Sequence, residues 1–179
     1  MRSLKRLLIE TTLITITTLS FGATAGVFEH NSNAYLDDQY NIIKYMFIDL
    51  EVAKTSDFEI KVVIPTEYGF QTGKSTLKRP MKDKLRSLSK VLQDYNESSI
   101  EIIGHTDSVG SEKSNLQLGK DRADAVRKVL LLGKVNPYRI ESLSDGEEVP
   151  KCTNETEEGR ECNRRVEINI MLEKELARY

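Results

Sequence analysis

The chain has 179 residues, and its 26 Lys and Arg side chains against 28 Asp and Glu side chains give a formal net charge of −2 at pH 7. This length predicts one domain with an extension. A mildly acidic chain has no overall attraction for nucleic acid or for anionic membranes, so neither is an expected partner.

Residues 1–25 have the pattern of a secretory signal peptide. A basic start precedes a mostly apolar, Thr-rich run over residues 7–21, and Ala23-Thr24-Ala25 forms a small-residue cleavage site. Glu10 interrupts the run, which leaves an uncleaved N-terminal anchor as the alternative, although the run is short for a membrane-spanning helix. Cleavage removes three basic residues and one acidic residue, which leaves 23 and 27 and a mature net charge of −4.

Residues 26–56 form an N-terminal extension with one amphipathic helix, expected over residues 35–53. Its apolar positions recur at helical spacing: Leu36, Tyr40, Ile43, Phe47 and Leu50. We expect the helix to pack on the domain that follows. The alternative is a docking or dimer helix, because Ile42, Tyr45, Met46 and Ile48 widen its apolar surface. Its partner would then be an envelope protein or a second copy of the chain.

Residues 57–173 form the predicted domain, and residues 174–179 are a short tail. Strands are expected over residues 58–64, 100–103, 139–143 and 166–172. One helix starts near Pro80, and its apolar residues are Met81, Leu85, Leu88 and Leu92. A second helix is expected to start at Ser114, with Gln117 completing a capping box, and to end at Gly133. The order is β-α-β-α-β-β, which predicts an α/β (α+β) sandwich.

The second helix contains an unusual cation. Arg122 lies about 40° from Leu118 around the helix and about 20° from Asn115, so it sits beside the apolar stripe. Removing a guanidinium from water costs several kcal/mol unless a partner compensates. That partner could be an internal carboxylate such as Asp107, in the turn before the helix, or the carboxylate of a ligand.

Three motifs in this region resemble the OmpA-like family of cell-wall-binding domains. They are His105-Thr106-Asp107-Ser108-Val109-Gly110, then Asn115-x-x-Leu118-x-x-x-Arg122-Ala123-x-x-Val126, then Asn163-Arg164-Arg165-Val166-Glu167-Ile168. They occur in the family's order and spacing, and the resemblance covers residues 57–172. It implies a mixed four-stranded sheet with helices packed on one face.

The resemblance also implies a function. Family members bind peptidoglycan without cleaving it, by holding the zwitterionic end of diaminopimelate in the stem peptide. The matching positions here are Asp107 and Arg122, with Asn115, Leu118, Thr106 and Arg164 around them. A guanidinium suits a carboxylate, and a carboxylate accepts from an ammonium group. No metal or cofactor is required, and the implied location is the periplasm, on the cell wall or at the outer membrane.

The sequence departs from the family pattern at three places. Gly119 replaces the usual Ser and should weaken the helix slightly. Ser144-Asp145-Gly146-Glu147 replaces a commoner Gly-Tyr-Gly-Glu, which is expected to remove an aromatic wall from the pocket. Gly73 lies where many members carry a polar residue. These departures bear on affinity more than on function.

Cys152 and Cys162 are the only cysteines, and they flank a polar loop just before Asn163. In an exported chain such a pair predicts a disulfide rather than a metal site. Closing a loop of about 11 residues should stabilise the fold by roughly 3 kcal/mol and steady Arg164.

Two other classes of function compete with binding. An enzyme is not expected, because a zinc hydrolase needs three ligands and no nucleophile is signalled beside His105. The remaining alternative is a structural or interaction module of a secretion or motility apparatus, with weak or lost peptidoglycan binding.

Overall fold

The computed structural model describes residues 32–172, so the predicted signal peptide and the predicted tail at residues 174–179 lie outside the described residues. The elements in chain order are α1 (Ser32–Met46), β1 (Glu51–Ser56), β2 (Glu59–Pro65), α2 (Thr66–Gly69), α3 (Arg79–Asp94), β3 (Ser98–His105), α4 (Glu112–Leu132), the 3-10 turn η1 (Pro137–Arg139), β4 (Ile140–Gly146), α5 (Glu157–Asn163) and β5 (Arg165–Leu172).

The strands form one mixed sheet in the order β1-β2-β5-β3-β4. Only the β3–β4 pair is parallel, and the other neighbours are antiparallel. The predicted β-α-β-α-β-β order is present as β2, α3, β3, α4, β4 and β5, so the mixed α/β architecture is confirmed. The count of four strands is wrong, because β1 adds a fifth at the edge next to β2.

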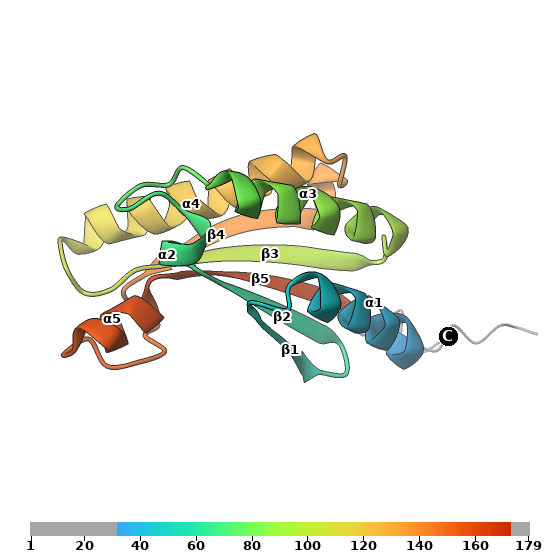
Figure 1. Cartoon of the computed structure of the whole chain (residues 1–179), viewed down its shortest axis with the longest axis horizontal. Coiled ribbons are helices and arrows are strands. Elements are labelled where there is room, and N and C mark those ends of the chain that lie inside the picture. The colour runs from blue at the N-terminus through green and yellow to red at the C-terminus, as the bar shows by residue number, and fades with distance from the viewer. Residues whose placement is uncertain (1–31, 173–179) are drawn as a thin grey trace, which may run out of the picture.

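Helices α1, α3 and α4 cover one face of the sheet, as Figure 1 shows. Every apolar residue predicted for the helix after Pro80 is buried there: Met81, Leu85, Leu88 and Leu92. The buried apolar side chains of α1, Leu36 and Ile43, and Phe47 directly after the helix belong to the same core. The expectation that the N-terminal helix packs on the domain is therefore confirmed.

Two predicted helix boundaries are wrong. Helix α1 ends at Met46 rather than near residue 53, because the polar segment that follows pairs with β2 as an edge strand. Helix α4 begins at Glu112, and its N-cap is Ser111, whose hydroxyl accepts from the Ser114 backbone N–H at 3.3 Å. None of the helices between residues 32 and 172 combines the length and apolar character needed to cross a bilayer.

Gly133 follows the end of α4, as predicted, but the reason for a glycine there differs from the predicted one. Gly133 has φ −77°, and the residue with positive φ is Lys134 at 66°. A Cβ on Gly133 would lie 2.3 Å from the Ser89 Cβ on α3. Glycine is therefore needed for the close contact between the two helices and not for a left-handed turn.

Helix α4 also lies unusually close to β3. A Cβ on Gly104 would come within 1.9 Å of the Gly119 carbonyl oxygen, and a Cβ on Gly119 within 2.2 Å of the Ser144 Oγ. The absence of side chains at these two glycines allows this approach, which places the first turns of α4 beside the end of β3.

Candidate functional site

A hollow of about 390 Å³ lies where α2, the turn after β3, the first half of α4 and the start of β5 meet. This is the end of the sheet at which α2 and α5 gather in Figure 1. All six side chains predicted from the sequence line the hollow: Thr106, Asp107, Asn115, Leu118, Arg122 and Arg164. The other lining residues are Thr66, Glu67, Gln71, Thr72, Gly73 and Val109.

Arg122 is the buried cation of this hollow, with 3% of its surface exposed. Its Nε donates to the Lys74 carbonyl at 3.3 Å, and its guanidinium lies 5.9 Å from the centre of the Phe70 ring. Its Nη1 is buried and has no hydrogen-bond partner among the described residues. Burial lowers the pKa of Arg122, and the charge of Arg164 lowers it further, against the opposing effects of Glu67 and Asp107. A buried polar atom without a partner is uncommon and requires an explanation.

Asp107 pairs with Arg164 and not with Arg122. The Asp107 Oδ2 accepts from the Arg164 Nη1 at 2.9 Å, and its Oδ1 accepts from the Val109 backbone N–H at 3.1 Å. The internal Asp107–Arg122 ion pair, left open by the sequence, is therefore absent from the structure. An aspartate that bonds the backbone two residues ahead fixes a turn, so Asp107 is held in position after β3.

Arg164 is bound by three carboxylates. Besides Asp107, its Nε donates to the Glu67 Oε1 at 2.6 Å and its Nη2 to the Glu157 Oε1 at 3.0 Å. Burial lowers the pKa of Arg164, but the hydrogen bonds that it donates to these carboxylates outweigh burial and raise the pKa above its ordinary value. Arg164 is thus paired within the protein, in contrast to Arg122.

Asn115 connects two sides of the hollow. Its Nδ2 donates to the Asp107 carbonyl at 3.2 Å and also to the carboxylate of Glu147. The Leu118 side chain, one turn further along α4, is half-buried and provides an apolar wall. The backbone N–H of Thr106 donates to the Gly146 carbonyl at 2.8 Å, which ties the turn to β4.

The Cys152–Cys162 disulfide is present, with the Cα atoms 6.0 Å apart. Asn163 directly follows the loop that the disulfide closes, and its Nδ2 donates to the Cys152 carbonyl and to the Asn154 Oδ1, both at 2.9 Å. The same Asn154 oxygen accepts from the Ser108 backbone N–H at 3.3 Å. The disulfide-closed loop therefore contacts the turn that carries Asp107.

His105 lies on the other face of the sheet. It lines a separate hollow of about 490 Å³ together with Asp145 and Glu167. Its ring nitrogens are 3.9 Å from the Asp145 Oδ2 and 4.0 Å from the Glu167 Oε1, too far for hydrogen bonds. The expectation that the candidate site loses an aromatic wall is wrong. Asp145, which replaces the aromatic residue of the family pattern, lines this second hollow and not the candidate site.

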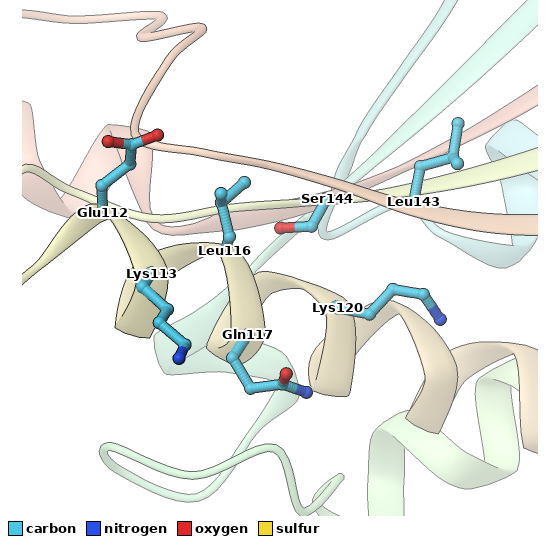
Figure 2. A pocket seen from close by; sticks show the side chains of 7 residues that line it. All are labelled: Glu112, Lys113, Leu116, Gln117, Lys120, Leu143 and Ser144. Atoms are coloured by element: carbon cyan, nitrogen blue, oxygen red, sulfur yellow. The ribbon is translucent and has the colours of Figure 1, made fainter.

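A third hollow, of about 520 Å³, lies between α4 and β4. Figure 2 shows Ser144 directed toward α4 and Leu143 directed away from it. Its lining includes no buried polar atom without a partner. The Lys120 Nζ, for example, pairs with Asp124. This hollow is therefore a weaker candidate for a polar ligand.

Sequence reasoning missed three acidic residues around the site: Glu67, Glu157 and Glu147. Glu67 follows Pro65 in the short helix α2, where no periodic pattern marks it. Glu157 belongs to α5, which was expected to be a loop. Glu147 ends the segment of residues 144–147, whose sequence indicates no role for it. Their contacts depend on the folded chain and not on local sequence.

Comparison with known proteins supports one family. The sequence model of the OmpA family matches residues 69–164, more than half of the chain. Outer membrane porin F from Pseudomonas fluorescens is 34% identical over 123 residues, 69% of this chain and 33% of that protein. The probable lipoprotein YiaD from Escherichia coli K12 is 33% identical over 121 residues, 68% of this chain and 55% of that one.

The fold comparison agrees with this result. The crystal structure of the peptidoglycan-associated lipoprotein from Burkholderia pseudomallei matches with a TM-score of 0.54 and 29% identity, over 57% of this chain and 87% of that chain. The chain spans between a third and just over half of the length of the curated relatives named above. Its sequence and its fold together place the chain in the OmpA family.

Proposed function

We propose that this protein binds peptidoglycan without cleaving it and anchors an envelope protein or complex to the cell wall from the periplasm. The ligand group is the free zwitterionic end of diaminopimelate in the stem peptide. The observation that carries the proposal is the buried Arg122, whose Nη1 lacks a partner in the hollow that Asp107 also lines.

The charges of the hollow match such a ligand. Arg122 offers a guanidinium to a carboxylate, and a planar guanidinium can bind a carboxylate through two parallel hydrogen bonds. Asp107 is ion-paired on one oxygen but retains lone pairs for an ammonium group. A ligand that carries both groups on one carbon atom would satisfy the cation and the anion together.

The names of the relatives point in the same direction. The solved homologue from B. pseudomallei is a peptidoglycan-associated lipoprotein, and a curated relative with the same name from Pseudomonas aeruginosa is 35% identical over 105 residues. Other relatives are outer-membrane proteins. These names support a location at the cell envelope.

Binding accounts for the site better than catalysis does. The lining includes no Ser, Cys or His side chain, and its two carboxylates, Glu67 and Asp107, both accept hydrogen bonds from Arg164. His105 directly precedes the lining residues Thr106 and Asp107 in the sequence, but it lines the hollow on the opposite face of the sheet. The lining offers paired charges and an apolar wall, which are the elements of recognition.

The test is co-sedimentation of the mature chain, residues 26–179, with purified diaminopimelate-type peptidoglycan. Asp107→Ala and Arg122→Ala should each weaken binding by about 2–5 kcal/mol, because each leaves a charge of the ligand unpaired. Arg127→Ala and Asp145→Ala are the matched controls, since Arg127 is on the same helix and Asp145 at the end of β4, and neither lines the hollow.

The unfolding free energy of each variant separates binding from folding. Arg122→Ala should fold normally, because Arg122 has no carboxylate partner to leave unpaired. A folded native chain that stays in the supernatant would contradict the proposal. It would favour the interaction module with lost peptidoglycan binding.

A further inference from the structure

The three carboxylates around Arg164 are not equivalent. Glu67, Asp107 and Glu157 each accept one hydrogen bond from a different nitrogen of the same guanidinium. Glu67 and Asp107 also line the candidate hollow, whereas Glu157 does not. The side chain of Glu157 is 61% exposed, against 39% for Glu67 and 13% for Asp107. Two of the three carboxylates are therefore in position to meet a ligand.

Both of these carboxylates keep unused acceptor capacity. The second oxygen of Glu67 accepts only from the Thr66 hydroxyl, at 3.3 Å, and that of Asp107 only from the Val109 N–H, among the described residues. An ionised carboxylate offers about four lone-pair positions. An ammonium group has three donors and no acceptor, so two neighbouring carboxylates suit it better than one.

The balance of charge supports the same arrangement. Glu67 and Asp107 share one cation, Arg164, with a third carboxylate, Glu157, so Arg164 does not neutralise both lining carboxylates. Arg122 provides the compensating positive charge elsewhere in the lining. The four charged side chains of the lining, Glu67, Asp107, Arg122 and Arg164, sum to zero, and together they offer a zwitterion both anionic and cationic partners.

We infer that Glu67 is a second ammonium-binding carboxylate and that, with Asp107, it determines the specificity of the site for a ligand with a free amino group beside its carboxylate. Arg164 is a positioning residue that holds the two carboxylates together. This inference rests on the proposed function. The inference adds to the proposed site a residue of α2, Glu67, which lies outside the three motifs.

The alternative role for Glu67 is to hold Arg164 and nothing more. Glu157 supplies the control, because it accepts from the same guanidinium without lining the hollow. Glu67→Gln and Glu157→Gln each remove one carboxylate from Arg164. Only Glu67→Gln removes an anion that a ligand could touch.

The experiment is an NMR titration of the full mature chain and both variants with a monomeric muropeptide that has a free diaminopimelate end. Glu67→Gln should raise the Kd about tenfold, the effect of one charge-assisted hydrogen bond. Glu157→Gln should change it less than about twofold, since its carboxylate is solvated and outside the hollow.

The same muropeptide with its diaminopimelate amino group acetylated completes the test. It should bind the native chain and Glu67→Gln with equal, weakened affinity, because the charge that Glu67 recognises is gone. Equal losses in Glu67→Gln and Glu157→Gln, or an undiminished effect of Glu67→Gln on the acetylated ligand, would overturn the inference but leave the proposed function intact. A native chain that binds neither ligand would overturn both.

Discussion

Arg122 and Arg164 line the same hollow, but their guanidinium groups have different partners. Arg164 has a carboxylate on each of its nitrogens, and its charge is used within the protein. Arg122 has one hydrogen bond, to a backbone carbonyl, and a buried nitrogen without a described partner. Because burying a cation without compensation is costly, Arg122 is the group that gains most from an anionic ligand.

Gly119 and Ser144 reverse the family pattern, which has Ser at the first position and Gly at the second. The hydroxyl is on β4 instead of on α4, and it fills the space above Gly119, where a Cβ would lie 2.2 Å from it. Gly119→Ser should therefore lower the unfolding free energy by about 1–3 kcal/mol through overpacking. Adding Ser144→Gly should restore part of that loss.

Urea denaturation of the two single variants and the double variant measures this coupling. The expected interaction energy is favourable and larger than about 0.5 kcal/mol. Additive effects of the two substitutions would show that the hydroxyl and the helix do not compete for the same space.

His105 should make stability depend on pH. Burial lowers its pKa, and the neighbouring Arg165 lowers it further, against weaker opposing effects of Glu167 and Asp145. The unfolded chain therefore binds the proton more readily than the folded chain does. The folded state should lose stability as the pH falls below about 6.5, and the loss should stop below the folded-state pKa.

Urea denaturation at pH 7.5 and pH 5.5 measures this loss. His105→Gln should reduce the difference between the two values, whereas His30→Gln should keep it. His30 is the only other histidine of the chain and lies outside the described residues. An unchanged pH dependence in His105→Gln would show that other groups cause it.

At the scale of elements, the disulfide-closed loop with α5 supports the candidate site from outside. Its Asn154 contacts the Ser108 backbone, and its Glu157 contacts Arg164. Replacing both cysteines, as Cys152→Ser with Cys162→Ser, should lower the unfolding free energy by roughly 3 kcal/mol. It should also weaken muropeptide binding, because the Asp107 turn loses a fixed neighbour.

Thermal unfolding and binding of the native chain under reducing conditions should reproduce both effects. An unchanged melting temperature and an unchanged Kd after verified reduction would contradict this role of the loop.

Helix α1 carries a buried polar side chain at its contact with the core. Gln39 is fully buried, and neither atom of its amide group has a hydrogen-bond partner among the described residues. Such a group costs about 1–3 kcal/mol. Gln39→Leu should therefore raise the unfolding free energy by about that amount.

Gln93→Leu is the control, because the Gln93 amide has hydrogen-bond partners and the Gln39 amide has none among the described residues. The Gln93 Nε2 donates to the carbonyl oxygens of Ser89 and Gly133, so its loss should lower stability. If chemical denaturation shows that Gln39→Leu destabilises the chain as Gln93→Leu does, the buried amide has a partner that this account lacks.

At the scale of the whole molecule, elements with a clear period could be predicted and those without one could not. Alternating residues such as Val166, Ile168 and Ile170 marked β5, and helical spacing marked α3. Strand β1 was missed because Glu51–Ser56 is polar and short, and it forms only through pairing with β2 at the sheet edge.

The candidate site shows the same division. Six of the lining residues could be predicted from motifs, and the fold gathers them around one hollow. Which carboxylate pairs with which guanidinium depends on how the fold brings together segments that are far apart in the chain, such as Glu67 and Arg164, whose sequence separation is 97. No local pattern contains that information.

The most direct test of the account is a crystal structure of the mature chain bound to a monomeric muropeptide with a free diaminopimelate end. The account predicts the terminal carboxylate on Arg122 and the ammonium group between Asp107 and Glu67, with Arg164 still paired to its carboxylates. A muropeptide in the hollow between α4 and β4, or one whose diaminopimelate leaves the Arg122 Nη1 without a partner, would contradict it.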